Sequence, residues 1–397
     1  MKCKLSDICS FRKGKVEVEN LNAKNYISTE NMLPNKCGIT EASSLPTVSL
    51  TQEYKNGDVL VSNIRPYFKK IWQAQYDGGC SNDVLVFVPK PNMDKDFLYY
   101  VLADDDFFTY SMATSKGTKM PRGDKTSIMQ YEVPLIDLQV QKKIASVLKA
   151  LDEKIELNNE INNNLEQQAQ ALFKKWFIDN PENVDWSAGT FRELIQSTLN
   201  GDWGKETPTG NNTEKVYCIR GADIPEVKAG NKGKMPTRYI LPKNLANKKL
   251  EAGDIVVEIS GGSPTQSTGR CTAITQSLLD RYDSSMVCTN FCKAIKPKNG
   301  YSLFVYYYWQ YLYEKGVFFS YENGTTGIKN LDFTGFIETE SIIVPPFDKV
   351  QVFDDYCKSI FSQIFANGKQ SEQLVSLRDA LLPKLMSGEL DVSDIDL

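Results

Sequence analysis

The 397-residue chain contains no histidine. Without an imidazole, the sequence excludes Ser-His-Asp and Cys-His catalytic arrangements and every zinc site that uses histidine. The nine cysteines form no CxxC pair, and the nearest two, Cys288 and Cys292, have no comparable second pair. We therefore expect buried thiols in a reducing cytoplasm and no metal site.

Long apolar runs and nucleotide-binding loops are also missing. The longest mostly apolar stretch, 301–313, suits a buried helix better than a membrane span, which needs about 20 such residues. Charges interrupt the N-terminal sequence MKCKLSDICSFRKGK throughout, unlike a secretory signal. No GxxxxGK[ST] loop is present, which argues against a motor ATPase. We expect a soluble, cytoplasmic chain.

Two short motifs come close to catalytic patterns. Val344-Pro345-Pro346-Phe347 resembles the (Asp/Asn/Ser)-Pro-Pro-(Tyr/Phe) motif of amino-methyltransferases, but valine offers no acceptor for the target amine. We interpret these residues as a junction between a strand and a helix. The three aspartates 104–106 lack a spaced partner and a lysine, so we expect an exposed helix or turn and not a nuclease site. The sequence thus predicts a chain that is not an enzyme and binds no cofactor or metal itself.

A net charge of −4 does not favour a nucleic-acid partner, but the excess acid is local. Residues 343–397 carry five basic and nine acidic groups, whereas the larger segments are balanced. Between Lys228 and Lys249 there are seven basic residues and no acid. Such a run indicates either a solvated loop or a strip that follows phosphates.

Short matches in the same order indicate that the chain is an internal duplication. Each half combines a turn before a β-branched strand, an aromatic helix, and a long amphipathic helix at its end. The matched segments are 54–61 with 250–257, 81–91 with 289–299, 97–100 with 304–307, 115–119 with 322–326, and 131–137 with 342–348. We therefore predict two globular α+β segments, each followed by one long helix.

The two long helices share a heptad pattern with asparagine near the middle. In the first, positions a are Ile144, Leu151, Asn158, Leu165 and Leu172, and positions d are Leu148, Ile155, Asn162, Ala169 and Trp176. In the second, positions a are Phe353, Ile360, Asn367, Leu374 and Leu381. This seam predicts a two-helix coiled coil, although two separate core helices would also show it. In an antiparallel pair Asn158, Asn162, Asn367 and Ser371 should meet and fix the register.

Three segments resemble the specificity subunit of type I restriction-modification systems. They are LRDALLPKLMSGEL (377–390), GDVLVSNIRPYFKK (57–70) and GDIVVEISGGSPTQSTGR (253–270). The resemblance implies two target-recognition domains, each reading one half of an asymmetric bipartite DNA site. An antiparallel helix pair would hold them apart and dock two modification subunits. S-adenosylmethionine, ATP and Mg²⁺ are then expected on the modification subunits and on motor-nuclease restriction subunits.

The resemblance and the repeat together suggest five parts. We expect target-recognition domains at 1–133 and 181–343, long helices at 134–180 and 344–390, and an acidic tail at 391–397.

In the first domain we expect DNA contacts from two basic loops. Arginine suits guanine and asparagine suits adenine in the major groove, while lysines suit phosphate. The candidate residues are Ser62, Asn63, Arg65, Tyr67, Lys69, Lys70, Lys116, Thr118, Lys119 and Arg122. A rigid proline-containing loop with solvated lysines is the alternative.

In the second domain the equivalent loops differ in chemistry, as expected if each half reads another sequence. The candidates are Ser260, Ser263, Thr265, Gln266, Ser267, Arg270, Thr325, Thr326 and Lys329. Four consecutive aromatic residues, 306–309, would face all sides of a helix and not one face, which favours core packing over base stacking. Two alternatives remain: a specificity subunit of a related system that cuts on both sides of its site, and a coiled-coil adaptor that binds proteins only.

Overall fold

The computed structural model describes residues 2–180, 186–263, 265–324 and 327–392. The chain forms two compact units, residues 1–153 with 374–397, and residues 154–373. Within the described ranges, no helix is both long enough and apolar enough for a bilayer span.

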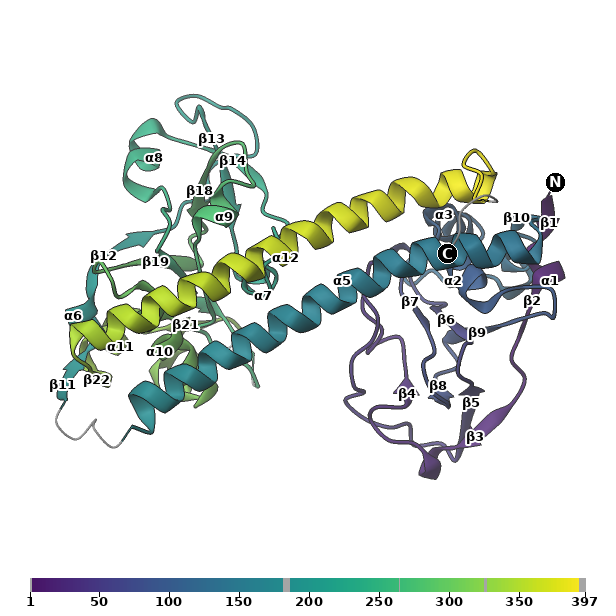
Figure 1. Cartoon of the computed structure of the whole chain (residues 1–397), viewed down its shortest axis with the longest axis horizontal. Helices are drawn as coiled ribbons and strands as arrows, with labels where there is room; N and C mark the ends of the chain where they lie inside the picture. The colour runs from purple at the N-terminus through teal and green to yellow at the C-terminus, as the bar shows by residue number, and fades with distance from the viewer. Residues whose placement is uncertain (1, 181–185, 264, 325–326, 393–397) are drawn as a thin grey trace. The chain divides into compact units, whose positions relative to one another are not determined.

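The first unit is built on two four-stranded sheets (Figure 1). Its strands are β1 (Lys2–Lys4), β2 (Cys9–Phe11), β3 (Lys15–Glu17), β4 (Tyr26–Ile27), β5 (Leu50–Tyr54), β6 (Val59–Ser62), β7 (Ile71–Gln73), β8 (Gly78–Cys80), β9 (Val84–Pro89) and β10 (Glu132–Pro134). Its helical segments are α1 (Leu5–Ile8), η1 (Val18–Asn20), η2 (Pro66–Phe68), α2 (Lys95–Ala103), α3 (Asp105–Ala113) and α4 (Lys125–Ile128), and α5 (Leu138–Phe173) follows. The sheets have the orders β2-β9-β6-β7 and β3-β5-β8-β4.

The second unit repeats this plan with insertions. Its strands are β11 (Ser187–Thr190), β12 (Ile195–Asn200), β13 (Glu214–Ile219), β14 (Thr237–Ile240), β15 (Ile255–Glu258), β16 (Ser260–Gly261), β17 (Cys271–Ala273), β18 (Ser285–Cys288), β19 (Cys292–Pro297), β20 (Glu322–Asn323), β21 (Lys329–Leu331) and β22 (Ser341–Val344). Its helical segments are η3 (Lys174–Ile178), which continues α5, η5 (Gly221–Asp223), α6 (Phe191–Leu194), α7 (Ile224–Lys228), α8 (Pro242–Lys248), α9 (Gln276–Leu279), α10 (Ser302–Glu314), η6 (Val317–Tyr321), α11 (Phe333–Thr339) and α12 (Phe347–Ser387).

Equivalent sheets show the duplication in three dimensions. The antiparallel sheet β12-β19-β15-β17 has the order of β2-β9-β6-β7 in the first unit. Each repeat also begins with a strand that pairs with the last strand before a long helix, β1 with β10 and β11 with β22. The predicted α+β class, with two repeated domains and a long helix after each, is confirmed.

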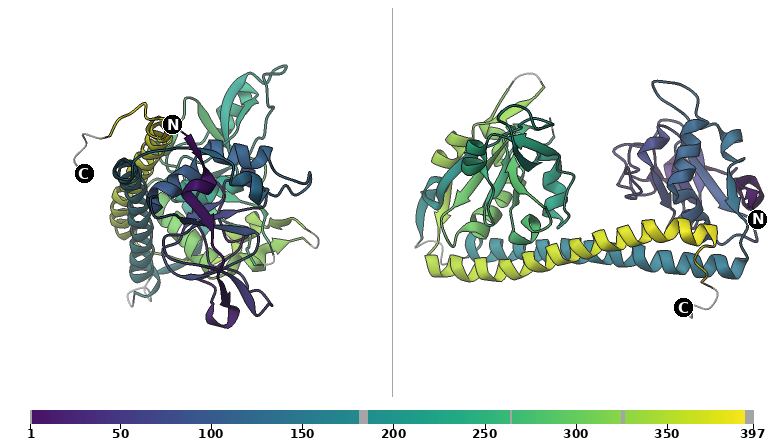
Figure 2. Two further views of the ribbon diagram at one scale, coloured as in Figure 1. Left: turned by 90° about the vertical axis from the view of Figure 1, so that its right-hand side faces the viewer. Right: turned by 90° about the horizontal axis from the view of Figure 1, so that it is seen from above.

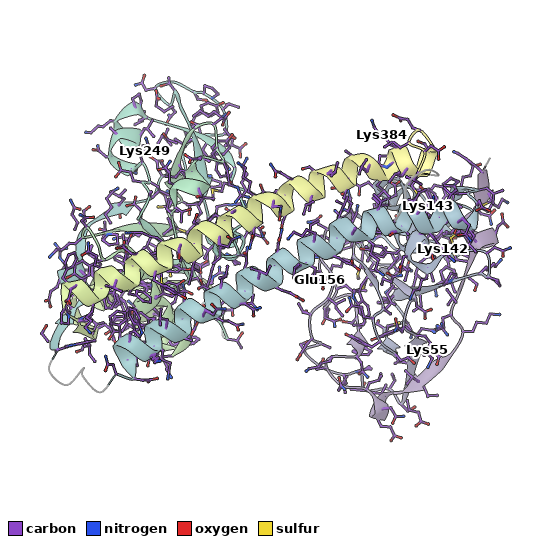
Figure 3. All side chains as sticks on the ribbon, in the orientation of Figure 1. Lys55, Lys142, Lys143, Glu156, Lys249 and Lys384 are labelled. Carbon is purple, nitrogen blue, oxygen red and sulfur yellow. The ribbon has the colours of Figure 1, made fainter. Side chains whose placement is uncertain are left out.

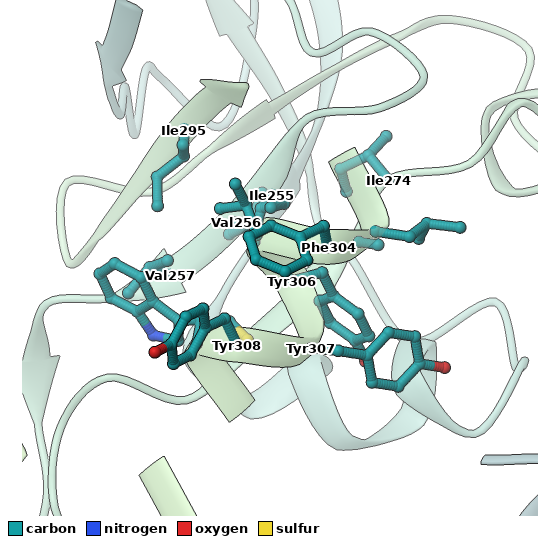
Figure 4. Close-up of a cluster of buried hydrophobic side chains, with 14 of the residues drawn as sticks. Ile255, Val256, Val257, Ile274, Ile295, Phe304, Tyr306, Tyr307 and Tyr308 are labelled. Atoms are coloured by element: carbon teal, nitrogen blue, oxygen red, sulfur yellow. The ribbon is translucent and has the colours of Figure 1, made fainter. Parts of the chain in front are cut away.

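The aromatic run on α10 lies in the core of the second unit. Tyr306, Tyr307, Tyr308 and Trp309 are all buried, and they pack with β15 residues such as Val256 (Figure 4). Core packing of this run is therefore confirmed. The junction that was predicted at 344–347 is also confirmed, because β22 ends at Val344 and α12 begins at Phe347.

The heptad seam is the buried stripe of both long helices. All of the heptad positions named above are buried or half-buried, whereas most of the positions between them are exposed. In the 154–373 unit, α5 and α12 run antiparallel, since Phe173 contacts Phe353 at one end and Asn158 contacts Ser371 at the other. Figure 2 shows the two helices side by side. In the unit that contains 374–397, Asp152 of α5 binds Arg378 of α12 at 2.6 Å.

Four polar side chains interrupt this seam within the 154–373 unit. The amide nitrogen of Asn158 donates to Ser371 Oγ at 3.2 Å, and that of Asn367 donates to Asn162 Oδ1 at 2.9 Å. Asn162 in turn donates to the carbonyls of Ile364, at 3.0 Å, and Ala229, at 3.1 Å. The bond to the Ala229 carbonyl joins the loop after α7 to the helix pair.

Candidate nucleic-acid interface

A loop between β6 and β7 carries the first group of candidate residues. Its ends are joined by a bond from the Ser62 N–H to the Lys70 carbonyl, 3.0 Å long. Arg65 and Lys69 both have φ of +50°, a left-handed conformation that costs a non-glycine residue about 1 kcal/mol or more. Strained backbone of this kind is concentrated at functional sites. Arg65 and Tyr67 have exposed side chains, whereas Ser62 is buried and Asn63 is half-buried.

The second basic loop of this unit lies beside the first. Ile64 and Arg122 form an antiparallel bridge, and the Arg65 N–H donates to the Pro121 carbonyl at 2.8 Å. Lys116 and Arg122 pair with each other across the second loop. Thr118 and Lys119 lie exposed at its tip. The structure therefore brings the ten candidates of this unit together at one end of the β6 sheet, with Ser62 and Asn63 at its base.

Acidic partners neutralise several of these cations. Lys69 binds Asp105 at 2.7 Å, Arg122 binds Asp83 at 3.2 Å, and Lys116 binds Asp124. Lys116 holds the pKa of the Asp124 carboxyl at about 2. Lys70 donates to the Thr29 carbonyl at 2.6 Å, and partial burial lowers its pKa. Arg65 and Lys119 have no ion-pair partner among the described residues. Exposed ion pairs contribute only about 0–1 kcal/mol, so phosphate can replace the carboxylates.

The equivalent loop of the second unit joins β15 to β17. The Glu258 N–H donates to the Arg270 carbonyl at 2.8 Å, which is the counterpart of the Ser62–Lys70 bond. Strand β16 within this loop pairs with β21, and β21 pairs with β20. The loop therefore lies beside the β20–β21 hairpin, just as the two basic loops of the first unit lie together.

Arg270 and Lys329 are held by buried carboxylates in this unit. Glu258 accepts two bonds from Arg270, at 2.7 and 2.8 Å, and these raise the arginine pKa. Lys329 binds Glu322 at 2.7 Å, and both carboxylates have side chains less than a tenth exposed. Arg270 is thus the structural counterpart of Lys70 and not of Arg65, which the sequence comparison did not indicate.

The other described candidates of the second unit differ in exposure. Thr265 and Gln266 have exposed side chains, and the Gln266 N–H donates to Ser263 Oγ at 3.0 Å. Ser260 donates to the Asn330 side chain at 2.6 Å, whereas Ser267 is buried. Thr325 and Thr326 lie outside the described residues.

Sequence reasoning missed the carboxylates that hold the basic side chains, and it missed the exposed side chain of Phe291 beside the second loop. A count of Lys and Arg near a loop gives no sign that Asp83, Asp105, Glu258 or Glu322 lies against them. The internal repeat could have indicated this position, because the matched segments 81–91 and 289–299 align Asp83 with Phe291.

The basic run 228–249 is largely engaged within the second unit. Lys228 lies 3.7 Å from Glu166, Arg238 binds Glu206 at 3.0 Å, and Lys248 lies 3.4 Å from Asp202. Lys249 is exposed just after α8 (Figure 3). These contacts favour a folded surface with a few solvated lysines over a continuous strip for phosphates.

Comparison with known proteins gives consistent matches. Residues 1–167 match the family described as the type I restriction modification DNA specificity domain. The MjaIX specificity subunit of Methanocaldococcus jannaschii is 26% identical over 78% of this chain and 72% of its own length. The HindI specificity subunit of Haemophilus influenzae is 25% identical over 92% of this chain and 94% of its own.

A solved structure shares the fold. The S subunit of a type I restriction-modification system from M. genitalium superposes with a TM-score of 0.58 at 16% identity, covering 99% of this chain and 96% of its own. The duplicated sheets and the paired loops agree with these matches: residues 1–167 are similar to the type I restriction modification DNA specificity domain, and the chain has the fold of a solved S subunit.

Proposed function

We propose that this protein is the DNA sequence-specificity subunit of a type I restriction-modification complex. Each target-recognition domain reads one half of an asymmetric bipartite site. The helix pair sets the spacer between the halves and docks two modification subunits. The observation that carries the proposal is the pair of equivalent loops, 62–70 and 258–270, which have the same backbone anchor and different side chains.

Differing side chains on a common scaffold suit the reading of two different half-sites. Arg65 and Asn63 offer groups for guanine and adenine in one domain, whereas Gln266 and several hydroxyls occupy the other loop. The lysines that border the loops suit phosphate, which supplies affinity without sequence information.

We further propose that the chain itself is not catalytic and binds no cofactor. S-adenosylmethionine then belongs to the modification subunits, and ATP with Mg²⁺ belongs to motor-nuclease restriction subunits. The methyltransferase-like residues 344–347 support this assignment, because they form a strand-to-helix junction with valine in the place of a hydrogen-bonding residue.

Methylome sequencing tests the proposal directly. Deletion of the gene should remove one bipartite adenine-methylation motif with a fixed spacer, and re-expression of the wild-type chain should restore it. The modification subunit must be shown by immunoblot to persist in the deletion strain. Persistence of every motif under that condition would contradict the proposed function.

A protein-only adaptor is the main competing function. It would use the heptad helices but would not need two different loops on equivalent sheets. Salt-dependent, site-specific DNA binding by the assembled complex separates the two, because an adaptor would not respond to a change in either half-site. Neighbouring genes would identify a related system that cuts on both sides of its site.

A further inference from the structure

The residue before β9 and the residue before β19 occupy the same structural position. Turns 81–84 and 289–292 both close with a 2.9 Å bond from the N–H of the last residue to the carbonyl of the first. In each turn the third residue, Asp83 or Phe291, donates its N–H to the hydroxyl of the first. The two positions are therefore equivalent in the duplicated fold.

This position lies directly beside the candidate reading loop in both units. The Asp83 carbonyl accepts from the Asn63 N–H at 2.8 Å. The Phe291 carbonyl accepts from the N–H groups of Ile259 and Ser260, at 2.9 and 3.2 Å. Both backbone contacts join the turn to the first residues of the loop.

The side chains at the two positions differ completely in chemistry. Asp83 forms an ion pair with Arg122, so it orients a candidate DNA contact. Phe291 is 58% exposed. Ile328, which precedes β21 in the neighbouring hairpin, is 60% exposed. Phe291 and Ile328 therefore place apolar surface beside the polar loop.

We propose that Phe291 contacts the 5-methyl group of a thymine in the half-site that the second domain reads. This inference rests on the proposed function and adds a specificity-determining residue to it. The thymine methyl is the apolar group that a base pair displays in the major groove, and phenylalanine is suited to contact it. Ser260, Gln266 and Asn330, on the adjoining loop and strand, supply hydrogen-bonding groups for the neighbouring base edges.

Replacing thymine by deoxyuridine tests the contact, since it removes only the methyl group. Binding of the full chain in its modification complex is measured on the native site and on duplexes with one uracil at each thymine of either half. In the wild type, uracil at one or more positions of a single half should weaken binding by about fourfold, the value expected for one buried methyl group.

Phe291→Ala should remove that response and weaken binding to the native site by about tenfold, because apolar contact is lost. Uracil effects in the other half should stay unchanged. Leu50→Ala is the matched control, since Leu50 is 47% exposed on β5 and lies on neither a candidate loop nor a long helix. It should retain the wild-type response at every thymine.

Three results would overturn the inference. They are a wild type that is insensitive to uracil throughout, an identical uracil profile for Phe291→Ala and wild type, and a loss of the response in Leu50→Ala. A wild-type complex that does not distinguish its site from scrambled DNA would instead overturn the proposed function, and this inference with it. Thermal unfolding of both variants establishes that they are folded.

Discussion

The side-chain amide of Asn367 donates a 2.9 Å hydrogen bond to the side-chain oxygen of Asn162 inside the heptad seam of the 154–373 unit. Both side chains are less than a tenth exposed. Asn162 has the larger set of partners, because its amide also donates to the Ile364 and Ala229 carbonyls. The two asparagines are therefore not equivalent.

Asn162→Ala should destabilise the protein more than Asn367→Ala. Losing Asn162 removes its bonds to the Ile364 and Ala229 carbonyls and leaves the buried Asn367 amide without its acceptor. A buried group left unsatisfied costs about 1–3 kcal/mol. Urea unfolding followed by circular dichroism measures the difference. The exposed neighbour Asn163 provides a control, since Asn163→Ala should change stability by less than about 0.5 kcal/mol. Equal costs for Asn162 and Asn367 would show that the extra carbonyl bonds contribute nothing.

Lengthening both helices should lengthen the accepted DNA spacer. Insertion of one heptad after Glu153 in α5 and one after Gln373 in α12 preserves the seam and adds about 10 Å of helix. That length corresponds to about three base pairs of DNA. Methylome sequencing of the variant should return both half-sites unchanged, with a longer spacer. An unchanged spacer would refute the idea that the helix pair measures the distance.

Arg65→Ala and Arg270→Ala should affect different half-sites. Each should weaken specific binding by about 1–3 kcal/mol, as expected for the loss of an arginine that reads a base. Arg270→Ala should also lower the unfolding temperature, because it leaves the buried Glu258 carboxylate unpaired. Binding to oligonucleotides altered in one half at a time separates the two effects. If both variants weakened recognition of the same half, the two-reader arrangement would be wrong.

The pair Glu258→Gln and Arg270→Ala refines this test. In the Glu258→Gln background, Arg270 no longer forms its bidentate contact with a carboxylate. The loss of DNA affinity that Arg270→Ala causes in this background therefore reports the contact of Arg270 with DNA alone. A role confined to holding the loop predicts that Arg270→Ala has no further effect on binding in the Glu258→Gln background.

Asp354→Asn should stabilise the protein at neutral pH. Asp354 Oδ1 accepts from the Leu303 N–H, at 2.7 Å, and the Phe304 N–H, at 3.3 Å, and an asparagine oxygen can do the same. Burial raises the pKa of this carboxyl, so the folded state resists its ionisation. The wild type therefore loses stability relative to Asp354→Asn as the pH rises above the ordinary aspartate pKa, and the two converge below it.

Thermal unfolding between pH 3.5 and pH 7 follows this divergence, and Asp354→Asn should be the more stable protein at neutral pH. Asp354→Ala is the matched control, because it removes both the charge and the cap of α10 and should destabilise at every pH. An Asp354→Asn variant that is less stable than wild type at pH 7 would contradict the prediction.

Periodic features of the fold could be predicted from the sequence because they depend on local spacing. The heptad positions from Ile144 to Leu381 form the buried seam, and the run Tyr306–Trp309 lies in the core. The loops 62–70 and 116–122 were both identified as basic, but their adjacency comes from the bridge between Ile64 and Arg122. That contact is set by strand pairing over a long sequence separation.

The local electrostatics could not be predicted for the same reason. Glu258 and Arg270 are 12 residues apart and meet only because the loop between them returns to its starting strand. Lys69 and Asp105 lie 36 residues apart and meet where α3 begins. The basic residues can be counted from the composition, but the composition does not show which of them form ion pairs with carboxylates.

The anchors of the two reading loops have a consequence for how this protein can evolve. The bonds from Ser62 to Lys70 and from Glu258 to Arg270 join main-chain atoms, so they do not depend on the side chains between them. The second loop is longer than the first and is closed in the same way. Insertions, deletions and exchanges between the repeats can therefore accumulate in the loops while the sheets persist. If the loops read DNA as proposed, a single genetic step can give a lineage a new target and protect it against DNA that lacks the old one.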